Sequence, residues 1–117
     1  MASSSSPSQP HSSPIAFAEV EWLAKTPDVG VRINTLSAGQ STPWHYHSTV
    51  ADDVFCLEGE LEVACRDPAE VSRLRPGERA RVAPTRVHRI VNRTRGPLRY
   101  LLIQATGAYD FNVVDDD

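Results

Sequence analysis

The feature that most constrains the fold is a series of short runs in which apolar and polar residues alternate. Alternation extends over residues 31–36, 61–66 and 79–83, and a period of two places the apolar side chains on one buried face of a strand. Turn residues such as Gly39 and Gly59 lie between the runs. Many short strands at intervals of about ten residues favour an all-β sandwich or barrel.

Three further features refine this expectation. Residues 98–103, LRYLLI, are apolar on nearly both faces and should be well buried or lie in an interface, whereas residues 67–74 are the segment that allows a helical turn or two. Cys56 and Cys65 are expected to be buried free thiols, because free cysteine packs as a small hydrophobe. If residues 53–58 and 60–66 form a hairpin, the two thiols lie near each other, and a disulfide then remains an alternative.

The chain of 117 residues suits one domain. Residues 1–14 are rich in serine and proline and are expected to be disordered, which removes His11 from the candidate ligands. Residues 15–114 should form the domain, and residues 115–117 an acidic tail.

Charge and hydropathy exclude several functional classes. The formal net charge is −3, which the three terminal aspartates account for, so the remainder is neutral and gives no electrostatic reason to expect nucleic acid. No apolar run approaches the roughly 20 residues of a membrane helix, and the start lacks the pattern of a secretory signal. We therefore expect a cytoplasmic protein with reduced thiols.

A pair of histidines points to metal binding. His45 and His47 stand two apart in a stretch that reads as a strand, so both imidazoles should face the same side of a sheet. Each imidazole bonds a divalent metal at about 2.0–2.1 Å, so two neighbours can reach one ion. Trp44 and Tyr46 should face the other side and pack there.

Two longer motifs contain this pair. The first reads GQSTPWHYHSTVADDVFCLEG and the second reads GERARVAPTRVHRIVN. They resemble the two motifs of the cupin superfamily, and in particular its small single-domain members of the RmlC-like, cupin-2 type. The positions that match are Gly39, His45, His47, Asp52, Gly59, Gly77, His88 and Asn92. The chain departs from the second motif at Ala83 and Thr85, where the family has proline and glycine.

The resemblance implies a jelly-roll β-barrel that holds one divalent transition metal: iron, manganese, nickel, copper or zinc. The ligands carried over are His45, His47, Asp52 and His88, with Asp52 and His88 as the catalytic residues. Asp52 stands where the family has glutamate and is one methylene shorter, so it binds the ion directly or through a water. Asp53 is the competing carboxylate, but the spacing to Gly59 favours Asp52.

The resemblance also implies a function. Such proteins include dioxygenases, isomerases, lyases and decarboxylases that act on a small oxygenated metabolite, and also modules that bind a ligand or stabilise a structure without turnover; we favour the enzyme. Asn92 should line the cavity or close a hydrogen bond near its mouth, and Arg86 is our candidate for recruiting a carboxylate substrate. The apolar strand at 98–103 and the aromatic residues Trp22, Trp44 and Tyr46 need more cover than one small barrel supplies, which predicts a homodimer.

Overall fold

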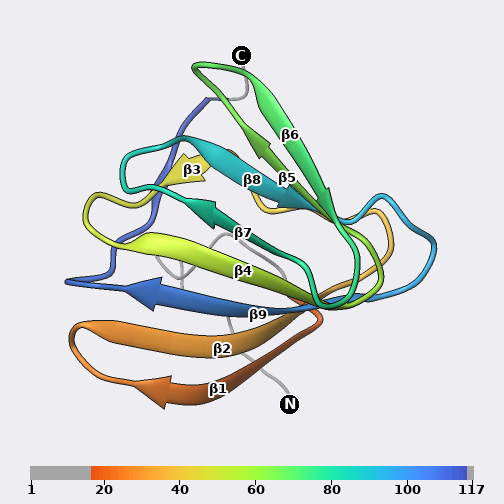
Figure 1. Cartoon of the computed structure of the whole chain (residues 1–117), viewed down its shortest axis with the longest axis horizontal. Coiled ribbons are helices and arrows are strands. Elements are labelled where there is room, and N and C mark those ends of the chain that lie inside the picture. The colour runs from red at the N-terminus through yellow and green to blue at the C-terminus, as the bar shows by residue number, and fades with distance from the viewer. Residues whose placement is uncertain (1–16, 116–117) are drawn as a thin grey trace.

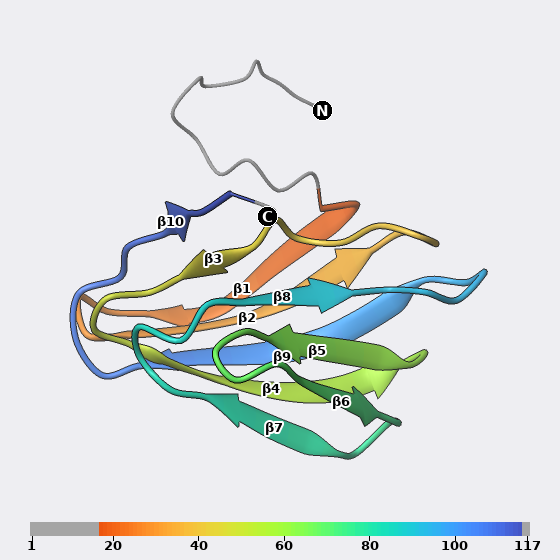
Figure 2. The ribbon, with the colours of Figure 1, turned by 90° about the horizontal axis from the view of Figure 1, so that it is seen from above.

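Ten strands in the described residues 17–115 of the computed structural model form two antiparallel five-stranded sheets that face each other (Figures 1 and 2). The strands are β1 (Glu19–Lys25), β2 (Val29–Leu36), β3 (His45–Tyr46), β4 (Ala51–Glu58), β5 (Leu61–Cys65), β6 (Glu70–Leu74), β7 (Arg79–Val82), β8 (His88–Val91), β9 (Leu98–Ala105) and β10 (Asn112–Val113). The all-β expectation is confirmed. The disorder expected for residues 1–14 concerns residues that lie outside the described range. Within the described range, no helix is long and apolar enough to cross a membrane.

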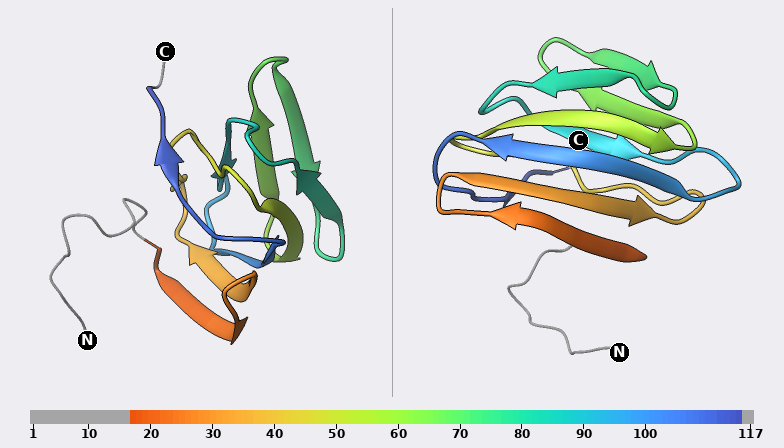
Figure 3. Two further views of the ribbon diagram at one scale, coloured as in Figure 1. Left: turned by 90° about the vertical axis from the view of Figure 1, so that its left-hand side faces the viewer. Right: turned by 60° about the horizontal axis from the view of Figure 1, so that its bottom comes forward.

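The strand order shows how the chain passes between the sheets. One sheet has the order β1-β2-β9-β4-β7 and the other β10-β3-β8-β5-β6, so the chain crosses repeatedly from one layer to the other. Figure 3 shows β9 (blue) in the middle of the first sheet, between β2 and β4. This central place explains the apolar composition of residues 98–103, of which the even positions face the core and are buried while the odd positions are half-buried.

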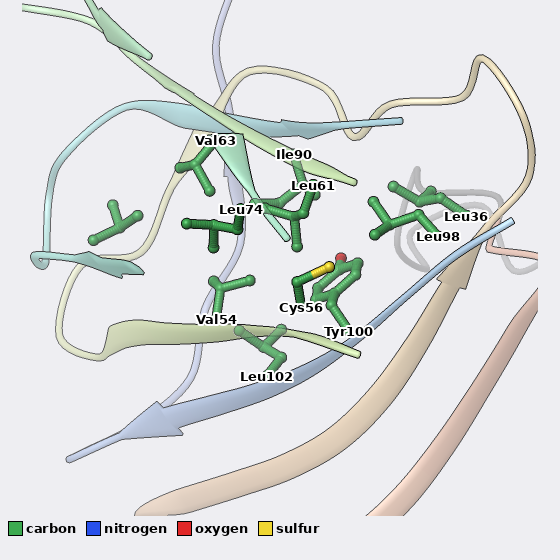
Figure 4. Close-up of a cluster of buried hydrophobic side chains, with 11 residues drawn as sticks. Leu36, Val54, Cys56, Leu61, Val63, Leu74, Ile90, Leu98, Tyr100 and Leu102 are labelled. Atoms are coloured by element: carbon green, nitrogen blue, oxygen red, sulfur yellow. The ribbon is translucent and has the colours of Figure 1, made fainter. Parts of the chain in front are cut away.

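Apolar side chains from both sheets fill one half of the space between the layers (Figure 4). The core includes Leu36, Val54, Cys56, Leu61, Val63, Leu74, Val82, Ile90, Leu98, Tyr100 and Leu102. Burial of such side chains stabilises the fold by about 25 cal/mol for each Å² of apolar surface. The core therefore occupies one end of the barrel and leaves the other end for polar groups.

Two possibilities that the sequence left open are not found in the structure. Within residues 67–74 the structure has a turn followed by β6, which pairs with β5 from Leu61↔Leu74 to Cys65↔Glu70. A neighbouring strand offers the backbone continuous hydrogen bonds, and these outweigh a weak local helical tendency. Residues 53–66 do not form a hairpin, because β4 and β5 belong to different sheets. Cys56 and Cys65 are both free thiols, as expected.

Two turns require glycine. Gly59, which connects the sheets between β4 and β5, has φ +91°, and a Cβ there would lie 2.7 Å from the carbonyl oxygen of Pro97. Gly77 has φ +92° but has open space around it. Both positions lie in the left-handed region, where only glycine is free of strain, but only Gly59 also has a backbone neighbour in the way.

The outer face of the second sheet holds a charged group that the alternation pattern placed in solvent. Glu62 is only 5% exposed, because Arg93 donates to both of its carboxylate oxygens, from Nε at 2.8 Å and from Nη2 at 3.0 Å. The hydrogen bonds from Arg93 lower the pKa of Glu62. A buried carboxylate on this face is thus paired with the fork of an arginine.

Candidate metal centre

Four side chains from three strands and one adjoining loop meet at the polar end of the barrel. His45 lies on β3 and pairs in register with His88 on β8, His47 follows β3, and Asp52 comes from β4 in the opposite sheet. One potential ligand atom from each residue lies within 4.8 Å of every other. All four residues are buried, with exposures of 1–4%. The structure thus brings together the four residues expected from the sequence.

The three imidazoles are oriented in the same way, by a hydrogen bond to the backbone. His45 Nδ1 lies 2.7 Å from the carbonyl oxygen of Pro43, His47 Nδ1 lies 2.7 Å from that of Asp110, and His88 Nδ1 lies 2.9 Å from that of Arg86. A carbonyl oxygen only accepts, so each Nδ1 carries the proton. With this proton alone, Nε2 holds a lone pair, which is the state a metal requires; the metal-free His47 ring carries a second proton on Nε2 when it donates to Asp52.

Asp52 completes the cluster. Its Oδ2 lies 3.0 Å from His88 Nε2 and 3.3 Å from His47 Nε2, and its Oδ1 accepts a hydrogen bond of 3.0 Å from Gln104 Nε2. Burial opposes ionisation, but the hydrogen bonds with His47 and His88 outweigh it and hold the pKa of Asp52 well below its usual value. The centre therefore holds a buried negative charge against which a cation is stabilised.

Two of the imidazoles differ in basicity. Burial, with the neighbouring His88 as a second cause, lowers the pKa of His45 from 6.5 to about 3. Burial also opposes protonation of His47, but its hydrogen bond and charge interaction with Asp52 outweigh burial and raise its pKa. His45 is thus a neutral nitrogen donor at neutral pH.

The neighbouring carboxylate has a different environment. Asp53 follows Asp52 on β4 and faces outward, where Arg81 Nη1 donates to its Oδ2 at 2.9 Å. Alternation along a strand sends adjacent side chains to opposite faces. The structure therefore places Asp52 in the cluster and leaves Asp53 in a surface ion pair.

Comparison with protein families matches residues 32–104, more than half of the chain, to the family described as Cupin domain. The chain belongs to the cupin family. No curated protein matches the sequence. Among solved structures, this cupin is similar to an uncharacterized protein with a double-stranded β-helix domain from Klebsiella pneumoniae, with 24% identity, a TM-score of 0.73, and coverage of 95% of this chain and 90% of that one.

Two structures of enzymes are also similar. An oxalate oxidase in complex with the substrate analogue glycolate has 18% identity and a TM-score of 0.73, with 88% of this chain and 57% of that chain covered. A cupin-superfamily sugar phosphate isomerase from Silicibacter pomeroyi has 21% identity and a TM-score of 0.61, with 77% and 70% covered. At these identities the likeness establishes the fold.

A pocket opens beside the four clustered residues of this cupin. It is small, with a cavity volume of about 20 Å³. Besides His45, His47 and Asp52 it is lined by Phe17, Arg32, Asn34, Thr42, Ile90, Tyr100, Leu102, Gln104 and Phe111. The apolar members lie among polar groups able to donate or accept hydrogen bonds, which is the usual make-up of a small-molecule site.

Sequence reasoning missed several of these residues. Gln104 donates to Asp52 and orients it. The one sequence feature that could have indicated this role is its even position at the end of the apolar run, which places Gln104 on the inner face of β9. Arg32 lies in an alternating run whose inward face was assumed to be apolar. Phe111, whose ring stacks on His45 at 4.3 Å between centroids, lies in a segment without any pattern.

Three roles expected from the sequence can be compared with the structure. Arg86 does not line this pocket; its guanidinium donates to the carbonyl oxygens of Arg66 and Pro68 and fastens the turn before β6. Asn92 lies at the end of β8 away from His88 and donates to the carbonyl oxygens of two loops, so it does not line the cavity. Trp44 faces away from the cluster as expected, against Arg66 and Arg89.

Proposed function

We propose that this cupin binds one divalent transition-metal ion through His45, His47, His88 and Asp52 and is an enzyme for a small oxygenated metabolite. The observation that carries the proposal is the common tautomer of the three imidazoles. Each ring has its Nδ1 proton held by a backbone carbonyl, and each Nε2 belongs to the same buried cluster. Such outer hydrogen bonds are what fix metal-binding histidines.

The donor set defines which ions fit. Three imidazole nitrogens and one carboxylate suit iron(II), manganese, nickel, copper or zinc, and do not suit calcium or magnesium, which prefer oxygen ligands. A bound ion of this kind supplies Lewis acidity and stabilises negative charge on a substrate oxygen. Asp52 is oriented by Gln104 and would tune the charge of the ion, or would accept a proton from a bound molecule if displaced from the ion.

The polar pocket supports an enzyme over a purely structural metal site. A structural site is closed by its own ligands and by apolar cover, whereas here Arg32, Asn34 and Gln104 line the space beside the cluster. The similar structures of an oxidase and an isomerase fit this proposal, although one fold hosts many activities.

One observation favours the second candidate, a cupin that binds a ligand or a metal without turnover. The ring of Phe111 lies nearly parallel to that of His45, with an angle of 15° between the planes, and covers one side of the cluster. Measuring turnover after the metal is known separates the two candidates.

The test is elemental analysis of protein purified without a metal-affinity column, for the wild type, His45→Ala and His11→Ala. We expect about one transition-metal ion per chain in the wild type and in His11→Ala, and loss of the ion in His45→Ala, because removal of one ligand costs a large part of the binding free energy. A wild-type protein without bound metal, also after incubation with iron(II), manganese or zinc, refutes the proposal.

A further inference from the structure

We propose that Arg32 makes the pocket specific for small carboxylates, which it binds through the carboxylate group while a second oxygen of the same molecule faces the metal centre. This inference rests on the proposed function and adds the substrate class to it. It assigns Arg32, on β2, the role that sequence reasoning gave to Arg86.

The sheet register places Arg32 on the inner face, near Asp52. Arg32 pairs with Leu102 on β9, and Leu102 pairs with Val54 on β4, two residues from Asp52 on the same face. Two strand spacings of about 4.8 Å and two residue steps of about 3.4 Å put the Cα atoms of Arg32 and Asp52 roughly 12 Å apart. Arg32 and Asp52 line the same pocket.

The surroundings of Arg32 hold its guanidinium without neutralising it. The group lies 4.9 Å from the ring centroid of Trp22 and 5.7 Å from that of Tyr109. Arg32 also forms a side-chain hydrogen bond with Tyr109, which is a neutral partner. Aromatic rings stabilise a cation over their faces, and the remaining N–H groups of the guanidinium can still donate. Among the described residues, no aspartate or glutamate forms an ion pair with Arg32.

Other arginines of the chain show the contrast. Arg81 pairs with Asp53, and Arg93 donates two hydrogen bonds to Glu62. These carboxylates lie on the outer faces of the barrel. Arg32 faces the pocket, where an incoming carboxylate is the missing partner for its donor fork.

A second observation points to a ligand on the same wall. Asn34 follows Arg32 by two residues, lines the pocket and is fully buried, and its Oδ1 has no hydrogen-bond partner. Its Nδ2 lies 3.3 Å from the hydroxyl of Tyr100. If the amide is turned over, the hydroxyl contacts oxygen and the nitrogen is left open, so one amide atom of Asn34 lacks a partner in either orientation. Such a buried group costs free energy unless a ligand or water bonds to it.

These groups define the ligand class. Arg32 selects a negative charge, Asn34 offers one hydrogen bond, and the metal centre takes an oxygen donor. The small cavity, with a volume of about 20 Å³, limits the ligand to a few non-hydrogen atoms. The ligand is therefore a short-chain carboxylate with a hydroxyl, oxo or second carboxylate group.

The test compares acids with their neutral amides. Zinc-loaded protein is titrated by calorimetry with glycolate, lactate, pyruvate and malonate, and with the corresponding amides. We expect at least one acid to bind about tenfold to a hundredfold more tightly than its amide, which is the worth of a hydrogen bond to a charged group. Absence of binding by all four acids, or equal binding of acids and amides, overturns the inference without any substitution.

Variants assign the effect to Arg32. Arg32→Gln should lose the preference for the acid and keep its zinc, and Arg32→Lys should keep part of the preference because it keeps the charge but loses the fork. Arg95→Gln is the matched control: it removes the same charge from an exposed arginine in the loop at the far end of β9. An equal loss in Arg95→Gln and Arg32→Gln refutes a specific role for Arg32.

The same titrations separate this inference from the proposed function. A wild type that binds zinc but shows no preference for acids contradicts the inference and leaves the metal centre standing. A wild type that binds no zinc refutes the proposed function. If the metal-free protein still binds acids more tightly than amides, and Arg32→Gln loses this difference, the result supports the carboxylate site without the metal centre.

Discussion

Replacing Asp52 with asparagine is the sharpest test of the electrostatics at the centre. The substitution keeps the shape of the side chain and the acceptor for Gln104, but removes the negative charge that faces His47 and His88 at 3.3 and 3.0 Å. Because these groups are almost fully buried, solvent screens their interaction little. We expect the metal-free variant to lose about 3 kcal/mol of unfolding free energy near pH 5, as in other broken buried pairs.

The pH dependence of this loss follows from the two shifted pKa values. The pKa of Asp52 is lowered on folding, so its contribution is present above the ordinary value of 3.8 and is lost as the pH falls. The pKa of His47 is raised on folding, so its contribution is present below the ordinary value of 6.5 and is lost as the pH rises through the folded value. The difference between wild type and Asp52→Asn should therefore peak between these limits.

The assay is urea unfolding of chelator-treated protein at about pH 3, 5 and 8.5, which samples the acidic side, the middle and the basic side of this range. Asp53→Asn is the control, because it removes the adjacent charge from a pair with Arg81, whose side chain is 62% exposed. Such surface pairs contribute about 0–1 kcal/mol. A loss in Asp52→Asn that is the same at all three pH values, or no larger than that in Asp53→Asn, refutes the reasoning.

Three further predictions concern the whole molecule. Zinc in large excess should raise the melting temperature by about 10 °C or more through binding to the folded state, and His88→Ala should abolish the rise; an equal rise in that variant speaks against the site. Gly77→Ala should lower the unfolding free energy by about 1 kcal/mol because of its positive φ. Gly59→Ala should lower it by about 2 kcal/mol more, because its Cβ would also meet the carbonyl oxygen of Pro97. Equal losses of unfolding free energy for the two variants in urea would contradict this contact. We also expect a homodimer, since edge strand β1 exposes Val20 and Leu23, and a monomer in sedimentation at micromolar concentration excludes it.

The sequence predicted the architecture because strand alternation is a local property. The runs at 31–36 and 79–83 became β2 and β7. In β7 the apolar Ala80 and Val82 face inward, as a half-buried strand requires, whereas in β2 the polar Arg32 and Asn34 lie on the inner face. The turn before β6 shows the limit of local patterns. Residues 70–74 form a strand because β5 lies beside them. Such pairing with a neighbouring strand cannot be predicted from the residues of the short segment itself.

The candidate centre divides in the same way. The spacing of His45 and His47 and the two motifs named all four clustered residues, because metal ligands must be particular residue types at positions that turns hold constant. No motif or spacing identifies Gln104, Arg32 or Phe111 in the sequence. A glutamine, an arginine or a phenylalanine is common anywhere in a chain, and its role at the pocket depends on which strands lie next to it.

The amino-acid sequence alone thus determined the β class, the family resemblance and the set of residues at the centre, since each depends on residue type and on short separations along the chain. Only the tertiary structure decided that each imidazole Nδ1 meets a backbone carbonyl, that Gln104 orients Asp52, and that Arg32 faces the pocket. These outcomes depend on pairing between strands distant in sequence, and the free energy of that pairing is a property of the whole barrel.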